Sequence, residues 1–141
     1  MMSIGRFTIL SAFLIFLQPL GAKAEGLQKW QCVVEDFKGL DTTDESFIEK
    51  NLRKSFMLMV TKTEVISKMT SKDFDASEDR FFHFYSDSLY RHSRTESLVS
   101  LDTLSIPRDP ESDVDKKGFF NAVISTQSAF YSNSWLLRCV E

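Results

Sequence analysis

Beyond residue 24 the chain contains very little glycine and proline. The glycines of that part are Gly26, Gly39 and Gly118, and the prolines are Pro107 and Pro110. Because glycine is well suited to tight turns, its scarcity predicts turns built largely from Asp, Ser, Asn and Lys. It also leaves no serine in a Gly-x-Ser-x-Gly nucleophile motif, and we predict no catalytic residue.

The chain also lacks an excess of basic residues, with 20 acidic against 17 basic and a net charge of −3. Two of the basic residues, Arg6 and Lys23, lie in the N-terminal segment, so the remainder is more acidic still. Binding to nucleic acid or to a membrane surface depends on basic patches or basic amphipathic helices. We therefore expect no nucleic-acid partner and no membrane-surface helix.

Residues 1–24 have the three parts of a secretory signal peptide. Arg6 supplies a positive charge, residues 7–17 form an apolar run, and Ala22-Lys23-Ala24 gives a small-x-small cleavage pattern. The run is too short for a membrane span, which needs roughly 20 apolar residues. We expect cleavage after Ala24 and export of one domain, residues 25–141, without a membrane span. The periplasm of a Gram-negative bacterium is favoured over the extracellular space, with eukaryotic secretion as the alternative.

The only cysteines, Cys32 and Cys139, lie near the two ends of this domain. Export permits disulfide formation, and two cysteines allow one intramolecular pair, with two separate thiols as the alternative. Their spacing does not match a metal-ligand pattern, alone or with His83 and His92. We therefore expect a structural disulfide, no metal and no cofactor.

Aromatic and β-branched residues in short alternating runs predict about seven to nine strands in the domain. No strand–helix–strand rhythm interrupts them, which indicates an antiparallel meander folded as a barrel or a sandwich. The predicted strands are 29–37, 56–60, 65–69, 80–85, 89–94, an irregular strand within 95–106, 119–126 and 129–139.

The cysteines favour the barrel. Period-two alternation places Cys32 on the apolar face of the first strand and Cys139 on that of the last. A disulfide between them requires these strands to be neighbours, which is what closure of a barrel achieves. The predicted fold is therefore mainly β, a small antiparallel meander closed as a barrel of about eight strands.

One stretch, residues 41–54, lacks a strand pattern. Ser46 and Glu49 have the spacing of a capping box and predict a short helix near residues 44–52. A solvated loop is the alternative.

A polar-aromatic patch of His83, Tyr85, Tyr90 and His92 lies on the two arms of a predicted hairpin. If the arms bring both histidines to one region, the patch is suited to metal binding or acid–base chemistry. The alternative is an ordinary hairpin with an aromatic inner face and a titratable outer face. We favour this alternative because no third ligand is set by spacing.

Residues 107–117 combine two prolines with many charges and predict a long exposed loop. Its acidic residues are Asp109, Glu111, Asp113 and Asp115. They form a candidate interaction loop for a basic protein partner. A calcium loop is less well matched because the glycine turn and terminal glutamate of an EF-hand are missing.

The chain resembles the small exported β-barrels of bacteria with a calycin or lipocalin-like layout. The resemblance rests on the leader, a first strand with Trp30-Gln31-Cys32, a polar excursion, a meander, and a last strand ending at Cys139. Where a lipocalin has Gly-x-Trp, this chain has only Lys29-Trp30-Gln31. The resemblance implies binding of an apolar ligand or a protein, as in periplasmic lysozyme inhibitors, and transfers no site residue.

Together these features predict a non-enzymatic exported binding module carrying a small apolar ligand. Apolar side chains of residues 56–60, 80–85 and 119–126 either line a pocket for it or simply fill the barrel. The alternative is a protein-interaction module or a lysozyme-type hydrolase inhibitor that uses its acidic loop. A third hypothesis is a small hydrolase in which His83 or His92 activates a nucleophile.

Overall fold

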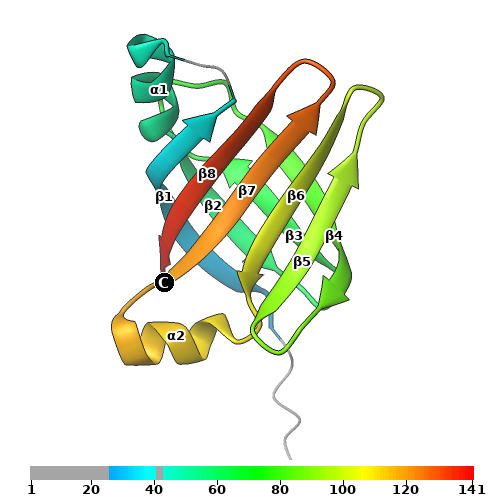
Figure 1. Ribbon diagram of the computed structural model, residues 1–141. Helices are drawn as coiled ribbons and strands as arrows, with labels where there is room; N and C mark the ends of the chain where they lie inside the picture. Colours follow the sequence, from blue (N-terminus) through cyan, green and yellow to red (C-terminus); the bar gives the residue numbers. More distant parts are fainter. Residues whose placement is uncertain (1–25, 41–42) are drawn as a thin grey trace, which may run out of the picture.

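The structure, a computed structural model, describes residues 26–40 and 43–141 and shows a closed barrel of eight antiparallel strands (Figure 1). Each strand pairs with the next in the chain, and the last pairs with the first. The predicted mainly β fold and its closure as a barrel are thus confirmed. The predicted signal peptide, residues 1–24, lies outside the described residues.

Two short helices accompany the strands. Helix α1 follows β1 at one end of the barrel, called here the α1 end, and α2 lies across the opposite end, called the α2 end (Figure 1). The elements are β1 (Gln28–Gly39), α1 (Glu45–Leu52), β2 (Ser55–Val60), β3 (Glu64–Met69), β4 (Glu78–Ser86), β5 (Tyr90–Glu96), β6 (Ser100–Pro107), α2 (Pro110–Lys117), β7 (Phe120–Ser128) and β8 (Ser132–Val140).

Helix α1 confirms the short helix predicted near residues 44–52, but Asp44 caps it rather than Ser46. A side-chain oxygen of Asp44 accepts hydrogen bonds from the backbone N–H groups of Ser46, at 2.9 Å, and Phe47, at 3.2 Å. A carboxylate in this position satisfies donors that the helix itself leaves unpaired. These hydrogen bonds lower the pKa of Asp44.

The prediction of a long exposed loop at residues 107–117 is wrong, because α2 occupies most of it. Asp109 caps the helix by accepting from the N–H of Ser112 at 3.1 Å, and Pro110 stands in its first turn. Gly118 ends it with a left-handed φ of 80°. Proline near the start and glycine just past the end are typical helix boundaries, so the sequence carried this signal.

The hairpin turns are built without glycine. At the β5–β6 turn, Ser97 Oγ accepts from the N–H groups of Val99, at 3.3 Å, and Ser100, at 3.0 Å, while Ser97 N–H donates to the Ser100 carbonyl. Thr61, Asp87 and Ser128 form the same arrangement in the β2–β3, β4–β5 and β7–β8 turns. Short polar side chains thus replace glycine, as the composition predicted for Ser and Asp. The Ser97 turn also divides the predicted irregular strand at 95–106 into β5 and β6.

The middle of the barrel is filled by its own side chains. The largest fully buried ones come from five strands and comprise Leu58, Val65, Leu104, Ile106, Phe120 and Leu137. Toward the α2 end, the Trp30 and Phe120 rings meet edge to face with centroids 5.1 Å apart. Burying each large apolar side chain contributes about 1.5–3 kcal/mol. An eight-stranded barrel encloses little more than such a core.

The disulfide closes the barrel as predicted. Cys32 and Cys139 stand directly opposite one another in the β1–β8 ladder, with Cα atoms 4.1 Å apart, and both side chains are fully buried. A β-bulge between Val34 and Asp36 lets β1 continue along β8 to Gly39. The bridge thus fixes the one pairing that links the two ends of the described chain.

We expect the double substitution Cys32→Ala/Cys139→Ala to lower the free energy of unfolding by roughly 2–5 kcal/mol. The bridge closes a loop with a sequence separation of 107, which strongly restricts the unfolded chain. Urea unfolding of the variant and of the oxidised wild type measures the difference. Equal unfolding midpoints would contradict a stabilising role for the bridge.

Candidate functional site

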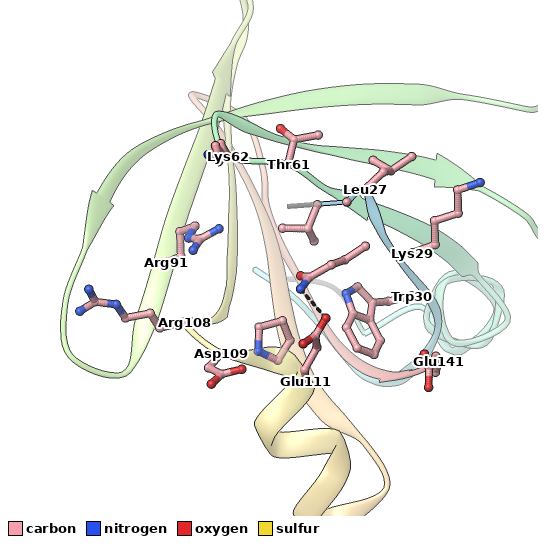
Figure 2. A pocket seen from close by; sticks show the side chains of 14 residues that line it. Leu27, Lys29, Trp30, Thr61, Lys62, Arg91, Arg108, Asp109, Glu111 and Glu141 are labelled. Carbon is pink, nitrogen blue, oxygen red and sulfur yellow. Dashed lines mark hydrogen bonds between the residues drawn. The ribbon is translucent and has the colours of Figure 1, made fainter. Parts of the chain in front are cut away.

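A hollow of about 1120 Å³ lies at the α2 end of the barrel (Figure 2). Its walls come from the start of β1, the β2–β3 turn, β5, the first turn of α2 and Glu141 after β8. This volume is slightly above the roughly 300–1,000 Å³ typical of small-molecule binding sites. The filled middle of the barrel closes it from one side, so a ligand has access only from outside.

The floor of the hollow is apolar. Trp30, Val60 and Pro110 line it and are themselves buried in the protein, and Leu27 adds an exposed apolar wall. The indole Nε1 of Trp30 is buried and has no hydrogen-bond partner in the described part of the chain. An unused donor therefore lies at the edge of an apolar floor.

The rim of the hollow is charged. Its basic residues are Lys29, Lys62, Arg91 and Arg108, and its acidic residues are Asp109, Glu111 and Glu141. Figure 2 shows Arg91 and Arg108 on one side and Lys29 on the other. Two of the carboxylates already serve the fold, because Asp109 caps α2 and Glu111 accepts from Gln28 Nε2 at 2.8 Å. The rim thus carries four basic groups against three carboxylates, two of which already serve the fold.

Arg91 is the basic residue best placed to meet a ligand. It stands opposite the fully buried Ile106 in the β5–β6 ladder, so its side chain starts from the inner face of the barrel. Its backbone takes part in the sheet, but within residues 26–40 and 43–141 its guanidinium has no hydrogen-bond or ion-pair partner. Arg108, in contrast, donates to the backbone carbonyl of Asp87 at 3.3 Å.

His83 points to the inside of the barrel near this end. Its Nε2 lies 3.1 Å from the carbonyl oxygen of Thr61 and its Nδ1 2.5 Å from Oγ of Ser93. Because a carbonyl only accepts, Nε2 donates to Thr61 and Nδ1 accepts from the Ser93 hydroxyl. Both ring nitrogens of the neutral imidazole are therefore used within the fold.

The other members of the predicted polar-aromatic patch lie on the outer face. Tyr85 stacks on His92 with centroids 5.7 Å apart, and Tyr90 lies 6.4 Å from the same ring. His92 Nδ1 lies 2.8 Å from Oγ of Ser105. The structure thus brings Tyr85, Tyr90 and His92 together and leaves His83 apart from them.

The two histidines do not converge because they lie on opposite faces of the sheet. His83 pairs with Ser93, which is fully buried, and His92 is the residue before Ser93 on the same strand. Neighbouring residues of a strand point to opposite faces. A bulge between His83 and Tyr85 then turns Tyr85 outward beside His92.

This geometry bears on the hydrolase hypothesis. The hydroxyl nearest to His83 belongs to Ser93, whose exposed fraction is 0 %, so a substrate has no access to it. In the part of the chain that the structure describes, no three His, Cys, Asp or Glu side chains are placed to hold a metal ion.

The predicted acidic loop residues are divided by α2. Asp109 and Glu111 lie at the hollow, whereas Asp113 pairs with Lys117 at 3.7 Å one helical turn away. Asp115 is exposed and does not line the hollow. The four carboxylates therefore do not form one continuous interaction loop.

Searches for similar proteins gave no match to a family model, a curated protein or a solved structure. Neither described helix is long and apolar enough to span a membrane. The calycin-like prediction is therefore supported only as a closed antiparallel barrel.

Sequence reasoning did not identify the hollow or Arg91. The signal for Arg91 was its phase within β5, where it shares the inner face with Ser93. The hollow itself is formed by five segments distant in sequence and has no motif.

His83 gives the fold a predictable pH dependence. Burial has the largest effect and lowers the pKa of His83; the hydrogen bond to the Thr61 carbonyl raises it in part, Arg91 lowers it again, and Glu64 has the smallest, raising, effect. The folded protein therefore binds this proton less readily than the unfolded chain, and stability falls as the pH drops below the ordinary histidine pKa. We expect His83→Gln to flatten the loss of stability between about pH 7.5 and 5.5 in urea unfolding. Parallel stability curves for both proteins would contradict this.

Proposed function

We propose that this protein is an exported, non-enzymatic binding module whose ligand occupies the hollow at the α2 end. The observation that carries the proposal is a hollow of about 1120 Å³ above a filled barrel core. It differs from the sequence-based hypothesis in placing the ligand at the mouth of the barrel and not within it. The calycin-like layout, a periplasmic location and the absence of catalysis remain parts of the proposal.

The lining favours an amphiphilic ligand with one anionic group. Trp30, Val60 and Leu27 offer apolar contacts to a chain or ring. Arg91 offers up to five donors in a planar fork, a geometry that matches a carboxylate or phosphate. Two of the rim carboxylates, Asp109 and Glu111, already serve the fold. An anionic ligand therefore gains more binding free energy at this site than an amine or a neutral ligand.

A protein-inhibitor role through the acidic residues of 107–117 is less well supported. Asp109 and Glu111 are engaged in helix capping and in the Gln28 hydrogen bond, and Asp113 is paired with Lys117. A partner would have to break these interactions to use the carboxylates.

The proposal is tested with decanoate as the anionic probe and decan-1-ol as its neutral counterpart. The chain has two tryptophans, so Trp135→Phe leaves Trp30 as the only indole reporter. Trp135 lies away from the hollow, where its Nε1 donates to Asn51 of α1. In this background we expect decanoate to change Trp30 fluorescence saturably and to bind more tightly than decan-1-ol.

Arg91→Gln should then weaken decanoate binding by about tenfold or more, because a charged hydrogen bond contributes about 1.5–3 kcal/mol. Decan-1-ol binding should not change. Arg94→Gln is the matched control, since it removes the same charge from the outer face of the same strand, where Arg94 lies over Phe84. Equal effects of the two substitutions, or no response of Trp30 to decanoate, would refute the proposed site.

A further inference from the structure

The α1 end of the barrel carries two apolar hairpin tips next to each other. Leu98 and Val99 form the tip between β5 and β6, and Phe130 and Tyr131 lie at the tip between β7 and β8. Their exposed fractions are 105 %, 72 %, 93 % and 43 %. We call these four residues the two-tip surface.

The tips are neighbours because β6 and β7 are paired up to their ends. Ser100 and Ser128, which border the two turns, stand directly opposite each other in this ladder. Figure 1 shows both hairpins extending past the barrel toward the α1 end. The two tips are thus neighbours, with Leu98 on the β5 side of one and Phe130 on the β8 side of the other. Two neighbouring apolar tips are unlike the single exposed apolar residues common on protein surfaces.

Each tip is held in place by its own hydrogen bonds. Ser97 Oγ accepts from two backbone N–H groups of the first turn, and Ser128 Oγ accepts from two of the second. The turns at the α2 end use the same arrangement, but their exposed positions are Lys62-Thr63 and Ser88-Leu89. Paired apolar tips are thus a feature of one end only, and their rigidity lowers the entropic cost of binding.

Unbalanced negative charge lies beside the tips. Asp102 stands two residues, about 7 Å, along β6 from Ser100. Partial burial raises the pKa of Asp79 on β4, and the negative charge of Asp102 raises it further, so the two carboxylates repel each other. Among the described residues neither forms an ion pair, and Asp102 Oδ1 is buried without a hydrogen-bond partner.

We infer that the two-tip surface docks a basic protein, one that presents an apolar pocket bordered by Lys or Arg side chains. Leu98 and Phe130 enter the pocket, and a cationic side chain of the partner approaches Asp79 and Asp102. The partner's charge relieves the repulsion between these carboxylates, which supplies charge complementarity in addition to apolar burial. This surface is at the opposite end from the proposed ligand site and does not depend on it.

Charge also decides against two other occupants. An anionic membrane would be repelled by Asp79 and Asp102 and by a chain whose net charge is −3. A second copy docking through the same surface would bring the same carboxylates face to face. A basic partner is the occupant that lowers the electrostatic energy of this end.

The test uses the oxidised protein carrying a photo-cross-linking group at Ser100, exposed to extract from its own source. Proteins captured by the wild type but not by Leu98→Ser/Phe130→Ser are identified, purified and titrated by calorimetry. We expect a protein of net positive charge whose affinity falls by about tenfold or more with Phe130→Ser, as is typical of central aromatic contacts. Affinity should also fall with Asp79→Asn/Asp102→Asn and with rising salt.

Leu89→Ser is the matched control, because Leu89 is an exposed residue of an equivalent turn at the α2 end and should leave the affinity unchanged. Asp79→Asn/Asp102→Asn removes the repulsion between the two carboxylates. The variant should therefore unfold at a higher urea concentration than the wild type at pH 7. Weakened binding by a more stable variant cannot be ascribed to misfolding.

Four results would overturn the inference. They are capture that is indifferent to the tip substitutions, an acidic captured partner, no captured partner at all, and tip-dependent binding to phosphatidylcholine vesicles or to a second copy of the chain instead. Sedimentation with vesicles detects binding to a membrane, and analytical ultracentrifugation detects binding to a second copy.

Discussion

The pairing of β1 with β8 is the constraint on which the rest of the structure depends. It removes the exposed edges that an open eight-stranded meander would leave. The Cys32–Cys139 bridge holds it at a position where both cysteines are fully buried. Because β1 is fixed there, Trp30 packs on Phe120 and becomes part of the floor of the hollow. Closure and the candidate site are therefore consequences of the same pairing.

A filled core leaves no room for a ligand in the middle of the barrel. The inner face carries Arg91 toward the α2 end, and Asp79 and Asp102 toward the α1 end. Apolar groups accompany the charges at both ends, as a floor at one and as projecting tips at the other. The two ends of the molecule therefore differ: a hollow with a mainly basic rim lies at one, and projecting apolar tips beside two carboxylates lie at the other.

The sequence predicted the closed barrel because the alternation of each strand and the phase of each cysteine can be read from short segments. Alternation identified the strands, and the phase of Cys32 and Cys139 required the first and last strands to meet. The prolines and charges of residues 107–117 predicted a loop, whereas Asp109 and Gly118 are the boundary signals of helix α2. The faces of His83 and His92 depended on hairpin register, and a one-residue shift in register exchanges the two faces of a strand. The hollow depends on packing between distant segments, which alternation does not report.

The central claim is that the ligand binds at the mouth of a filled barrel. It is tested most directly by ¹H–¹⁵N NMR spectra of the oxidised protein titrated with decanoate. The account predicts that the largest shift changes occur at the Trp30 indole, at Arg91 and at Glu111, while the amides of Leu58 and Leu104 barely move. Largest changes at Leu58 and Leu104 would mean that the barrel opens to take the ligand inside, and would contradict the account.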